Sequence, residues 1–452
     1  MATSNQIVNS SYSYLKHKDE KGAISRVAYI ILSLLLISAF GPYLAPANGI
    51  RLEHIVIYPL ALFFGVRYLM VPQKPTPRVY RIIMALWAAL IIWMFLITYI
   101  QKPSFSFFTI AAMENIIQPL ALIFILGELL KRLDYQGQLR FFKTAAWWII
   151  ILLALNALLS IATIFLDTWP VVRLFVRGGD LLSTVWGRSV TNGRFIGIFN
   201  QPFEAGIAYS VGLMGWMYLL LKQKTMSFFF WILGTMLVIG GLLSISKVFI
   251  LGGIPAAITY AIWIVNIKST KRIIGIIIAS LAAMKIITSL GKWTGLQYFL
   301  RLFDTRQVSE VGAISLYTGG RLGGETSAVT HLFRRVWETS PIVGFGFGVT
   351  FALDNAYLEF FYQGGLVAMM LYIAVLTILG VSFFRGLSSG NMEARLAFLL
   401  IIIVIFAGLG APVLTINRAS ILMWVFLITL LFINWSKQEQ SSQTLPDAIP
   451  ER

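Results

Sequence analysis

Runs of about twenty apolar residues recur along this chain from Val27 to Trp435, and they constrain its fold more than any other feature. Each run is long enough to cross a hydrocarbon core of roughly 30 Å as a helix. Apolar residues make up 58% of the 452 residues and charged residues only 12%, whereas a soluble domain carries roughly 25% charged residues. The sequence therefore predicts an all-α, polytopic integral membrane protein.

Hydropathy predicts about twelve transmembrane helices in residues 27–435. The predicted spans are 27–45, 54–71, 81–100, 108–130, 144–166, 206–221, 226–245, 248–267, 273–290, 355–384, 396–414 and 420–435. The polar segment 1–26 is longer than the first region of a signal peptide, and no small-residue cleavage site follows at the expected place. We therefore expect an uncleaved first helix. The polar tail 436–452 is expected to be disordered.

Lysine and arginine accumulate in alternate connections, and this pattern gives the orientation of the helices. The short connections between the basic ones carry only Arg51, Lys102 and Arg418. Because basic loops stay in the cytoplasm, both termini are predicted to be cytoplasmic. The basic connections are 73–81, 131–143, 222–224, 268–272 and 385–395.

Two long connections, 167–205 and 291–354, lie on the outer side by this count and are rich in arginine. Long translocated loops do not follow the rule that basic residues stay in the cytoplasm. This explains why arginine is tolerated there, but it does not explain why arginine is present. Within the second connection, apolar residues at 328, 329, 332, 333, 336 and 337 follow the spacing of one helix face. We expect an amphipathic helix beside the bilayer there, which would present His331, Arg334 and Arg335 on its other face.

Several classes of function are disfavoured by the composition. The chain has no cysteine, which excludes disulfides and zinc–thiolate sites. It contains no Asp-x-Asp motif and no His/carboxylate cluster with metal spacing, so no metal and no other cofactor is expected. Basic residues are divided between two sides of a membrane and no nucleic-acid-binding motif is present, so nucleic acid is not an expected partner.

Two cations at the outer surface are candidates for binding an anion. Arg194, in "GRFIGIFNQP", could hold two oxygens of a lipid phosphate or pyrophosphate, or could instead anchor a helix by snorkelling to the headgroups. Lys247, in "SISK", lies at the outer end between two apolar segments, where a charge usually faces a cavity. Glu114 and Glu204 fall at a similar depth and are candidate salt-bridge partners for these cations.

Arg321 stands in the glycine-flanked "GGRLGG", where the backbone and the guanidinium can approach an anion closely. Farther on, the three glycines within 344–348 are expected to form a flexible turn that returns the chain to the membrane. Asp354 then begins a helix, where its carboxylate could cap the N-terminus or act as a base. The polar residues that follow it are Asn355, Tyr357 and Glu359.

Five short motifs occur in the order found in the bacterial O-antigen ligase and polymerase superfamily, which this chain resembles. The large outer connection also precedes the third-last helix, as it does in that family. The motifs are RFIGIFNQP at 194–202, SISK at 244–247, GR at 320–321, PIVGFGFG at 341–348 and DNAYLEFFYQGGL at 354–366.

The resemblance implies a glycosyltransferase of the bacterial cytoplasmic membrane that works on the outer side and uses no metal. Its donor would be a glycan on undecaprenyl pyrophosphate, and a chain-length regulator and a flippase would be candidate partners beside the membrane lipid. Ligases of the family place a histidine where this chain has Asp354, which favours a polymerase.

The same resemblance implies roles for individual residues. Asp354 would be the base that activates an acceptor hydroxyl, with Glu359 and His331 as alternatives. The pyrophosphate would be bound by Arg194, Arg321 and Lys247, assisted by Arg334 and Arg335. The sugars would contact Asn200, Asn355 and Tyr357.

Two alternative functions remain open. The chain could be the sister ligase, which transfers a finished glycan to a lipid or another acceptor. It could also be a twelve-helix transporter of lipid-linked sugar or another anion, which would be expected to show broken helices and charges near the bilayer midplane, often in repeated halves. The candidate residues lie at one surface and no internal repeat is evident, which favours the enzyme.

Overall fold

The computed structural model describes residues 25–45, 49–101, 107–178, 180–181, 183–223, 227–264, 267–290, 295, 328–348, 355–388 and 390–443. Two residues singled out by the sequence, Arg321 and Asp354, lie outside the described residues.

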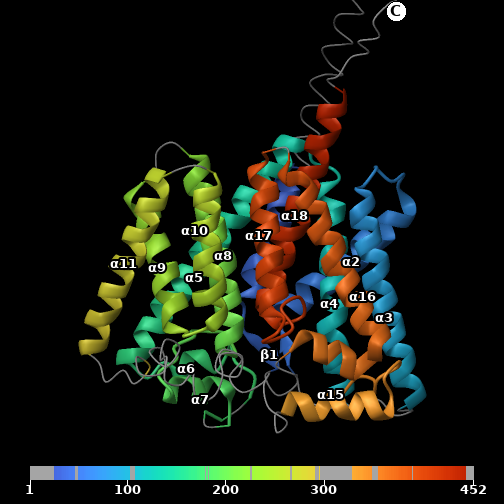
Figure 1. Ribbon diagram of the computed structural model, residues 1–452, viewed down its shortest axis with the longest axis horizontal. Helices are drawn as coiled ribbons and strands as arrows, with labels where there is room; N and C mark the ends of the chain where they lie inside the picture. Colours follow the sequence, from blue (N-terminus) through green and yellow to red (C-terminus); the bar gives the residue numbers. More distant parts are fainter. Residues whose placement is uncertain are drawn as a thin grey trace, which may run out of the picture.

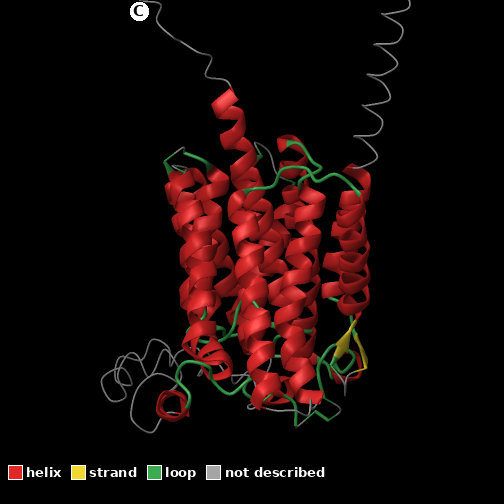
Figure 2. Ribbon diagram, turned by 90° about the vertical axis from the view of Figure 1, so that its right-hand side faces the viewer, coloured by secondary structure: helices red, strands yellow, loops and turns green. Residues whose placement is uncertain are grey.

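The described chain forms a bundle of helices that run side by side (Figures 1 and 2). Each predicted span overlaps one of these helices. They are Ser25–Ala39, α2 (Leu52–Met70), α3 (Arg78–Gln101), α4 (Phe107–Leu130), α5 (Tyr135–Phe165), α8 (Pro202–Lys222), α9 (Phe228–Leu243), α10 (Ile254–Trp263), α11 (Ile267–Leu290), α16 (Ala356–Leu387), α17 (Met392–Ala407) and α18 (Asn417–Gln443).

Length and composition identify seven helices in the described ranges that could cross a membrane, together with three shorter apolar helices. The all-α class and the multi-pass membrane character are thereby confirmed. The predicted number of about twelve spans is not confirmed by this criterion.

The short elements gather at one end of the bundle, opposite the C-terminal end of α18, and we call this end the loop face (Figure 1). The amphipathic helix expected in the second long connection is α15, and it lies across the bundle rather than along it. The elements of the loop face are the antiparallel pair β1 (Tyr43–Ala45) and β2 (Ile50–Arg51), with α6 (Trp169–Val172), α7 (Val185–Thr191) and α15 (Ala328–Thr339).

Helices α8 and α18 form the centre of the bundle. In their most apolar stretches, 94% and 89% of the residues are buried, whereas in α2 the share is 17%. Small residues allow the neighbouring helices to approach closely, as is usual where hydrocarbon surrounds the protein. A Cβ atom at Gly212 of α8 would lie 2.4 Å from Leu153 of α5, and one at Gly215 would lie 2.9 Å from Phe426 of α18. The close packing of α5, α8 and α18 therefore requires these glycines.

Several helices begin earlier than the hydropathy predicts, and the local sequence explains two of these differences. Helix α5 begins at Tyr135, inside the predicted connection 131–143, because the Asp134 side chain caps it by accepting a hydrogen bond from Gly137 N at 2.7 Å. Helix α8 begins at Pro202 rather than at residue 206, since proline suits the first turn of a helix.

Other predicted limits differ as well, and two of them change how a segment is described. The first helix ends at Ala39, before the sequence Gly41–Pro42, so residues 43–45 of the predicted span form β1 instead. Helix α18 continues to Gln443, and the tail predicted to be disordered from residue 436 therefore begins as helix.

The predicted turn is the segment Pro341–Gly348, which we call the glycine strap, and it is hydrogen-bonded to α16. Helix α16 breaks at Gly365, where φ is 65° and ψ is −164°. The strap supplies donors to carbonyls beside the break: Phe345 N donates to Tyr362 O at 2.9 Å, and Gly346 N donates to Gln363 O at 2.8 Å. The strap thus restores hydrogen bonds that the break would otherwise leave unmade.

The alternating glycines of the strap have a structural reason. Gly344, Gly346 and Gly348 have φ values of 69°, 77° and 70°, in the left-handed region that side chains rarely adopt. A Cβ atom at Gly344 would lie 2.5 Å from Gly365 N, and one at Gly346 would lie 2.9 Å from the Cα of Thr98 in α3. The strap therefore needs glycine both for its conformation and for its contact with two helices.

We predict that Gly365→Ala destabilises the protein. The φ and ψ of Gly365 are essentially confined to glycine, and an added Cβ would lie 2.1 Å from Ile342 O. We expect a loss of about 3 kcal/mol, measured as a lower thermal midpoint of the detergent-solubilised protein.

Gly65→Ala in α2 is the matched control, because nothing lies within 4 Å of the added Cβ. This variant should keep or slightly raise the midpoint, since alanine favours a helix over glycine. Equal midpoints for Gly365→Ala and the unchanged protein would contradict the structural role of the break.

Candidate functional site

A strained turn joins α9 to the π-helix η2 (Phe249–Gly253). This turn, Ser244–Lys247, contains Ile245 with a φ of 45°, the one positive φ value among the described non-glycine residues. A β-branched residue is a genuine outlier there, and strain of this kind clusters at functional sites. The π-helix that follows is a second feature frequent at such sites. The turn is therefore a candidate site on backbone grounds alone.

The Arg194 side chain is fastened to this turn. Its Nε donates to Ser244 O at 3.3 Å and its Nη2 donates to Ile245 O at 3.2 Å. The cation thereby lies at the carbonyl end of α9, where the helix dipole favours positive charge. Lys247 is half-buried and ends the same turn. Two of the predicted pyrophosphate-binding residues thus belong to one local unit.

Arg418, at the start of α18, is fully buried and joins three separate segments. Its Nη1 donates to Ile198 O at 3.1 Å, and its Nη2 donates to Gly41 O at 3.0 Å and to Phe175 O at 2.9 Å. The guanidinium also stands over the ring of Tyr43, 5.5 Å from the centroid. Arg418 therefore ties the segments of the loop face to the central helix.

Glu204, in the first turn of α8, is a neighbour of Arg418 in this network and is also fully buried. It accepts hydrogen bonds from Arg418 N at 3.1 Å and from Asn200 N at 3.0 Å. The Asn200 side chain accepts from Arg177 N at 3.0 Å and donates to the Tyr43 hydroxyl at 3.2 Å. The structure thus assigns Asn200 and Glu204 supporting roles beside Arg418.

A second buried group lies at the start of α2. Arg51 Nη1 is 2.6 Å from Glu53 Oε1, and both side chains are buried. Burial alone lowers the pKa of Arg51, but Glu53 and weaker contributions from nearby acidic groups outweigh it and raise the pKa. His54 Nε2 lies 2.9 Å from Glu114 Oε1, which also accepts from the Tyr58 hydroxyl at 3.1 Å. Glu114 therefore pairs with His54.

Sequence reasoning missed most of these buried residues. In the sequence, Arg51 and Arg418 stand out only as isolated cations in short connections that carry almost no other charge. That isolation is a usable signal, because a lone arginine that is not needed for orientation has to be explained by a partner or a site. Glu53 pairs locally with Arg51, whereas His54 and Tyr58 become significant only through Glu114, which is distant in sequence.

The beginning of α16 uses its polar residues to secure the helix. Asn355 is the N-cap: its side chain accepts from Leu358 N at 2.9 Å and donates to Leu409 O at 3.3 Å. The cap is therefore one residue later than Asp354, where the sequence placed it. The Tyr357 hydroxyl donates to Ile405 O at 2.9 Å. Glu359 is half-buried in the first turn, where the helix dipole favours a carboxylate.

Helix α15 packs on this part of α16 and keeps its cations at the surface. Val336 is fully buried and belongs to a small apolar cluster with Phe361 of α16. His331 and Arg334 are exposed. Arg335 is also exposed, and its guanidinium carbon lies 5.4 Å from the ring centroid of Phe345 in the glycine strap. The predicted amphipathic arrangement is confirmed for these residues.

The first turns of α8 and α16 are linked through the connection between α17 and α18. Ala356 N donates to Gly408 O at 2.8 Å, and a Cβ atom at Gly410 would lie 2.9 Å from the ring of Phe203. In the next turn of α8, a Cβ atom at Gly206 would lie against Ser246 Oγ. We call the turn Ser244–Lys247, together with the Arg194 side chain bonded to it, the Arg194 turn. This turn contacts the beginning of α8, and the N-cap of α16 is linked to the same part of α8 through the connection between α17 and α18.

Comparison with models of protein families and with curated proteins finds no match for this chain. In the described ranges, no group of three or more histidine or carboxylate side chains is placed to hold a metal ion.

We predict that Arg418→Met destabilises the fold, because it removes the donors to three carbonyls in a dry environment. Leaving buried acceptors unsatisfied should cost about 3 kcal/mol or more, measured as a lower thermal midpoint and a lower yield of monodisperse protein. Arg385→Met, at an exposed position near the end of α16, is the matched control and should change neither quantity. A normal midpoint for Arg418→Met would disprove the clamping role.

Proposed function

We propose that this protein is a membrane glycosyltransferase that lengthens a glycan carried on polyprenyl pyrophosphate, and that it is a polysaccharide polymerase. The loop face would be the outer face of a bacterial cytoplasmic membrane, and the lipid-linked repeat unit would be both the substrate and the principal partner. The order of the sequence motifs and the chemistry of the loop face support this proposal.

The observation that carries the proposal is the Arg194 turn. Two donors of the Arg194 fork are oriented by the carbonyls of Ser244 and Ile245, and Lys247 follows directly on the same turn. Fixed positive charge stabilises the negative charge that develops on a departing pyrophosphate, because the groups need no reorganisation during the reaction. Arg321, Arg334 and Arg335 would add charge from the second long connection.

The reaction requires one proton transfer. The oxygen of a sugar hydroxyl attacks the anomeric carbon of the donor, the bond from that carbon to the pyrophosphate oxygen breaks, and the hydroxyl proton passes to a base. Asp354 is the proposed base. The N-cap of α16 is Asn355, so the helix does not need residue 354 for capping, and the structural explanation for this carboxylate is weakened.

A second candidate function, transport of a lipid-linked sugar, is favoured by two breaks within the bundle. The passage from α9 to η2 is strained at Ile245, and α16 is interrupted at Gly365. Transporters commonly build their sites from discontinuous helices. The sister ligase is distinguished from a polymerase only by its acceptor, and no described contact selects between the two.

We predict that Arg194→Lys lowers chain extension by about 10²-fold, because lysine keeps the charge but loses the oriented fork of donors. The measurement is the size distribution of glycan made by purified protein from a lipid-linked repeat unit. Arg188→Lys is the control, since Arg188 is an exposed arginine on the neighbouring α7.

Full activity of Arg194→Lys at a normal thermal midpoint would reject the proposed role of this side chain. Wild-type protein that moves the lipid-linked sugar across reconstituted vesicles without lengthening it would instead support the transporter.

We predict that Asp354→Asn abolishes polymer while the donor remains bound, since an amide cannot accept the hydroxyl proton. The loss should be about 10²- to 10⁴-fold, the usual contribution of a general base. Glu359→Gln and His331→Gln test the alternatives under the same assay. Turnover retained in Asp354→Asn but lost in one of these variants would transfer the role of base to that residue.

A further inference from the structure

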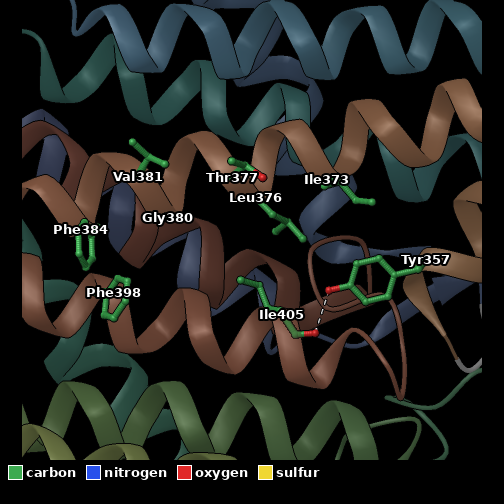
Figure 3. A pocket seen from close by; sticks show the side chains of 9 residues that line it. All are labelled: Tyr357, Ile373, Leu376, Thr377, Gly380, Val381, Phe384, Phe398 and Ile405. Atoms are coloured by element: carbon green, nitrogen blue, oxygen red, sulfur yellow. Dashed lines mark hydrogen bonds between the residues drawn. The ribbon is translucent and has the colours of Figure 1, made fainter.

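A groove of about 460 Å³ lies between α16 and α17 (Figure 3). Its lining side chains are apolar apart from Tyr357 and Thr377, and the Tyr357 hydroxyl is already bonded to Ile405 O. Such a lining accepts any hydrocarbon chain of a bilayer and does not select one lipid over another. Selection between lipids requires charge, and cations lie close together where α2 and α4 end.

Helices α2 and α4 pack against each other, and both end opposite the loop face. Helix α2 follows directly on β2, an element of the loop face, so its last turn lies at the other end of the bundle (Figure 1). Helix α4 runs in the same direction, because a Cβ atom at Gly348 of the glycine strap would lie 2.9 Å from the Cα of Thr109 in its first turn. We call the ends of these two helices the far end, which the predicted orientation places on the cytoplasmic side.

Three cations lie at the far end beside one carboxylate. Glu128, in the last turn of α4, forms an ion pair with Lys131 and accepts from Arg132 Nη2 at 3.4 Å. Lys131 Nζ also donates to Gln73 Oε1 at 2.5 Å. Arg67, in the last turn of α2, forms no side-chain hydrogen bond or ion pair with the part of the chain that the structure describes. The ion pairs of Glu128 therefore leave positive charge in excess.

Arg67 and Arg132 are neighbours. The guanidinium carbon of Arg132 lies 5.9 Å from the ring centroid of Phe64, which precedes Arg67 by one turn on the same face of α2. Burial and the like charge of Arg67 lower the pKa of Arg132 by more than Glu128 raises it. Asp134, the next carboxylate along the chain, caps α5 instead. An anion between the two guanidinium groups would relieve their repulsion and accept hydrogen bonds from both.

The surroundings of this cation pair match a bilayer. Helix α2 is the least buried of the seven helices that could span a membrane within the described ranges. Apolar side chains around Arg67 are exposed, namely those of Phe63, Val66, Leu69 and Met70. They would contact acyl chains, and Arg67, one turn from the end of the helix, would extend to the headgroups. An anion that reaches the pair from this side is therefore the headgroup of a membrane lipid.

We propose that the far end binds an anionic phospholipid, with its phosphate between Arg67 and Arg132 and its acyl chains along α2. The excess of cations selects a headgroup with net negative charge over a zwitterionic one, whose ammonium group would be repelled. The site does not depend on the proposed function. A lipid that fastens α2 to α4 would also support the contacts of His54 and Tyr58 in α2 with Glu114 in α4.

The test uses the full-length protein in detergent and two phospholipids with identical acyl chains, phosphatidylglycerol and phosphatidylcholine. Phosphatidylglycerol should raise the thermal midpoint and reach saturation, whereas phosphatidylcholine should raise it much less, because the headgroup rather than the chains is recognised. Arg67→Gln should raise the phosphatidylglycerol concentration needed for half of the effect about tenfold, the equivalent of one lost charge-assisted hydrogen bond. This variant should fold normally, since Arg67 is exposed, and Arg132→Gln should weaken the response in the same way.

Arg140→Gln is the matched control, because it removes an exposed arginine from α5 at the same end of the bundle. Its response to phosphatidylglycerol should equal that of the wild type. An equal loss in Arg67→Gln and Arg140→Gln would overturn the proposal, since general attraction of a basic surface to anionic lipid would then account for the effect. An unchanged response in both Arg67→Gln and Arg132→Gln would overturn it as well.

Soluble anions distinguish a lipid site from a site for free phosphate. Inorganic phosphate and glycerol phosphate should leave the midpoint unchanged at the same concentration, because they lack the acyl chains that would contact α2. Stabilisation by these ions equal to that by phosphatidylglycerol would reject a lipid as the ligand. The measurement needs neither glycan nor turnover, so its result does not depend on whether the protein is a polymerase.

Discussion

The loop face depends on one buried guanidinium. Arg418 is fully buried, and its hydrogen bonds to three carbonyls and the neighbouring Glu204 carboxylate offset the cost of removing its charge from water. Those acceptors, Gly41, Phe175 and Ile198, belong to segments far apart in the chain. Ile198 follows Arg194 closely in sequence, so the clamp that closes the bundle also holds the segment from which the candidate phosphate ligand projects. Arg418 therefore both stabilises the fold and holds the segment that contains Arg194.

Backbone hydrogen bonding explains the other unusual part of the fold. Helix α16 breaks at Gly365, and a break inside a spanning helix is tolerated only where other groups satisfy the freed backbone atoms. The glycine strap does this through the N–H groups of Phe345 and Gly346. Since α15 packs on the same stretch of α16, the break, the strap and the surface helix form one assembly beside the α16 cap.

Sequence predicted the parts of this structure that depend on local pattern. Apolar runs located the spans, and the spacing of Val336 and its neighbours predicted α15. Contacts across the fold could not be predicted in this way: the acceptors of Arg418 and the partner of Glu114 are distant in sequence. The strap shows the limit most clearly, because its glycines predict a turn but do not predict the close approach of α3 and α16 that excludes larger side chains there. The N-cap at Asn355 rather than Asp354 is a one-residue error of the kind expected at helix ends.

The central position of α18 has a consequence for biosynthesis. Helix α18 is 89% buried, yet it is translated after all the other described helices. Until it enters the bilayer, its neighbours α4, α5 and α8 face lipid or the insertion machinery with the surfaces that will later enclose it. Assembly of the bundle is therefore completed late, and a ribosome stalled before α18 would leave an open ring of helices exposed to membrane quality-control proteases.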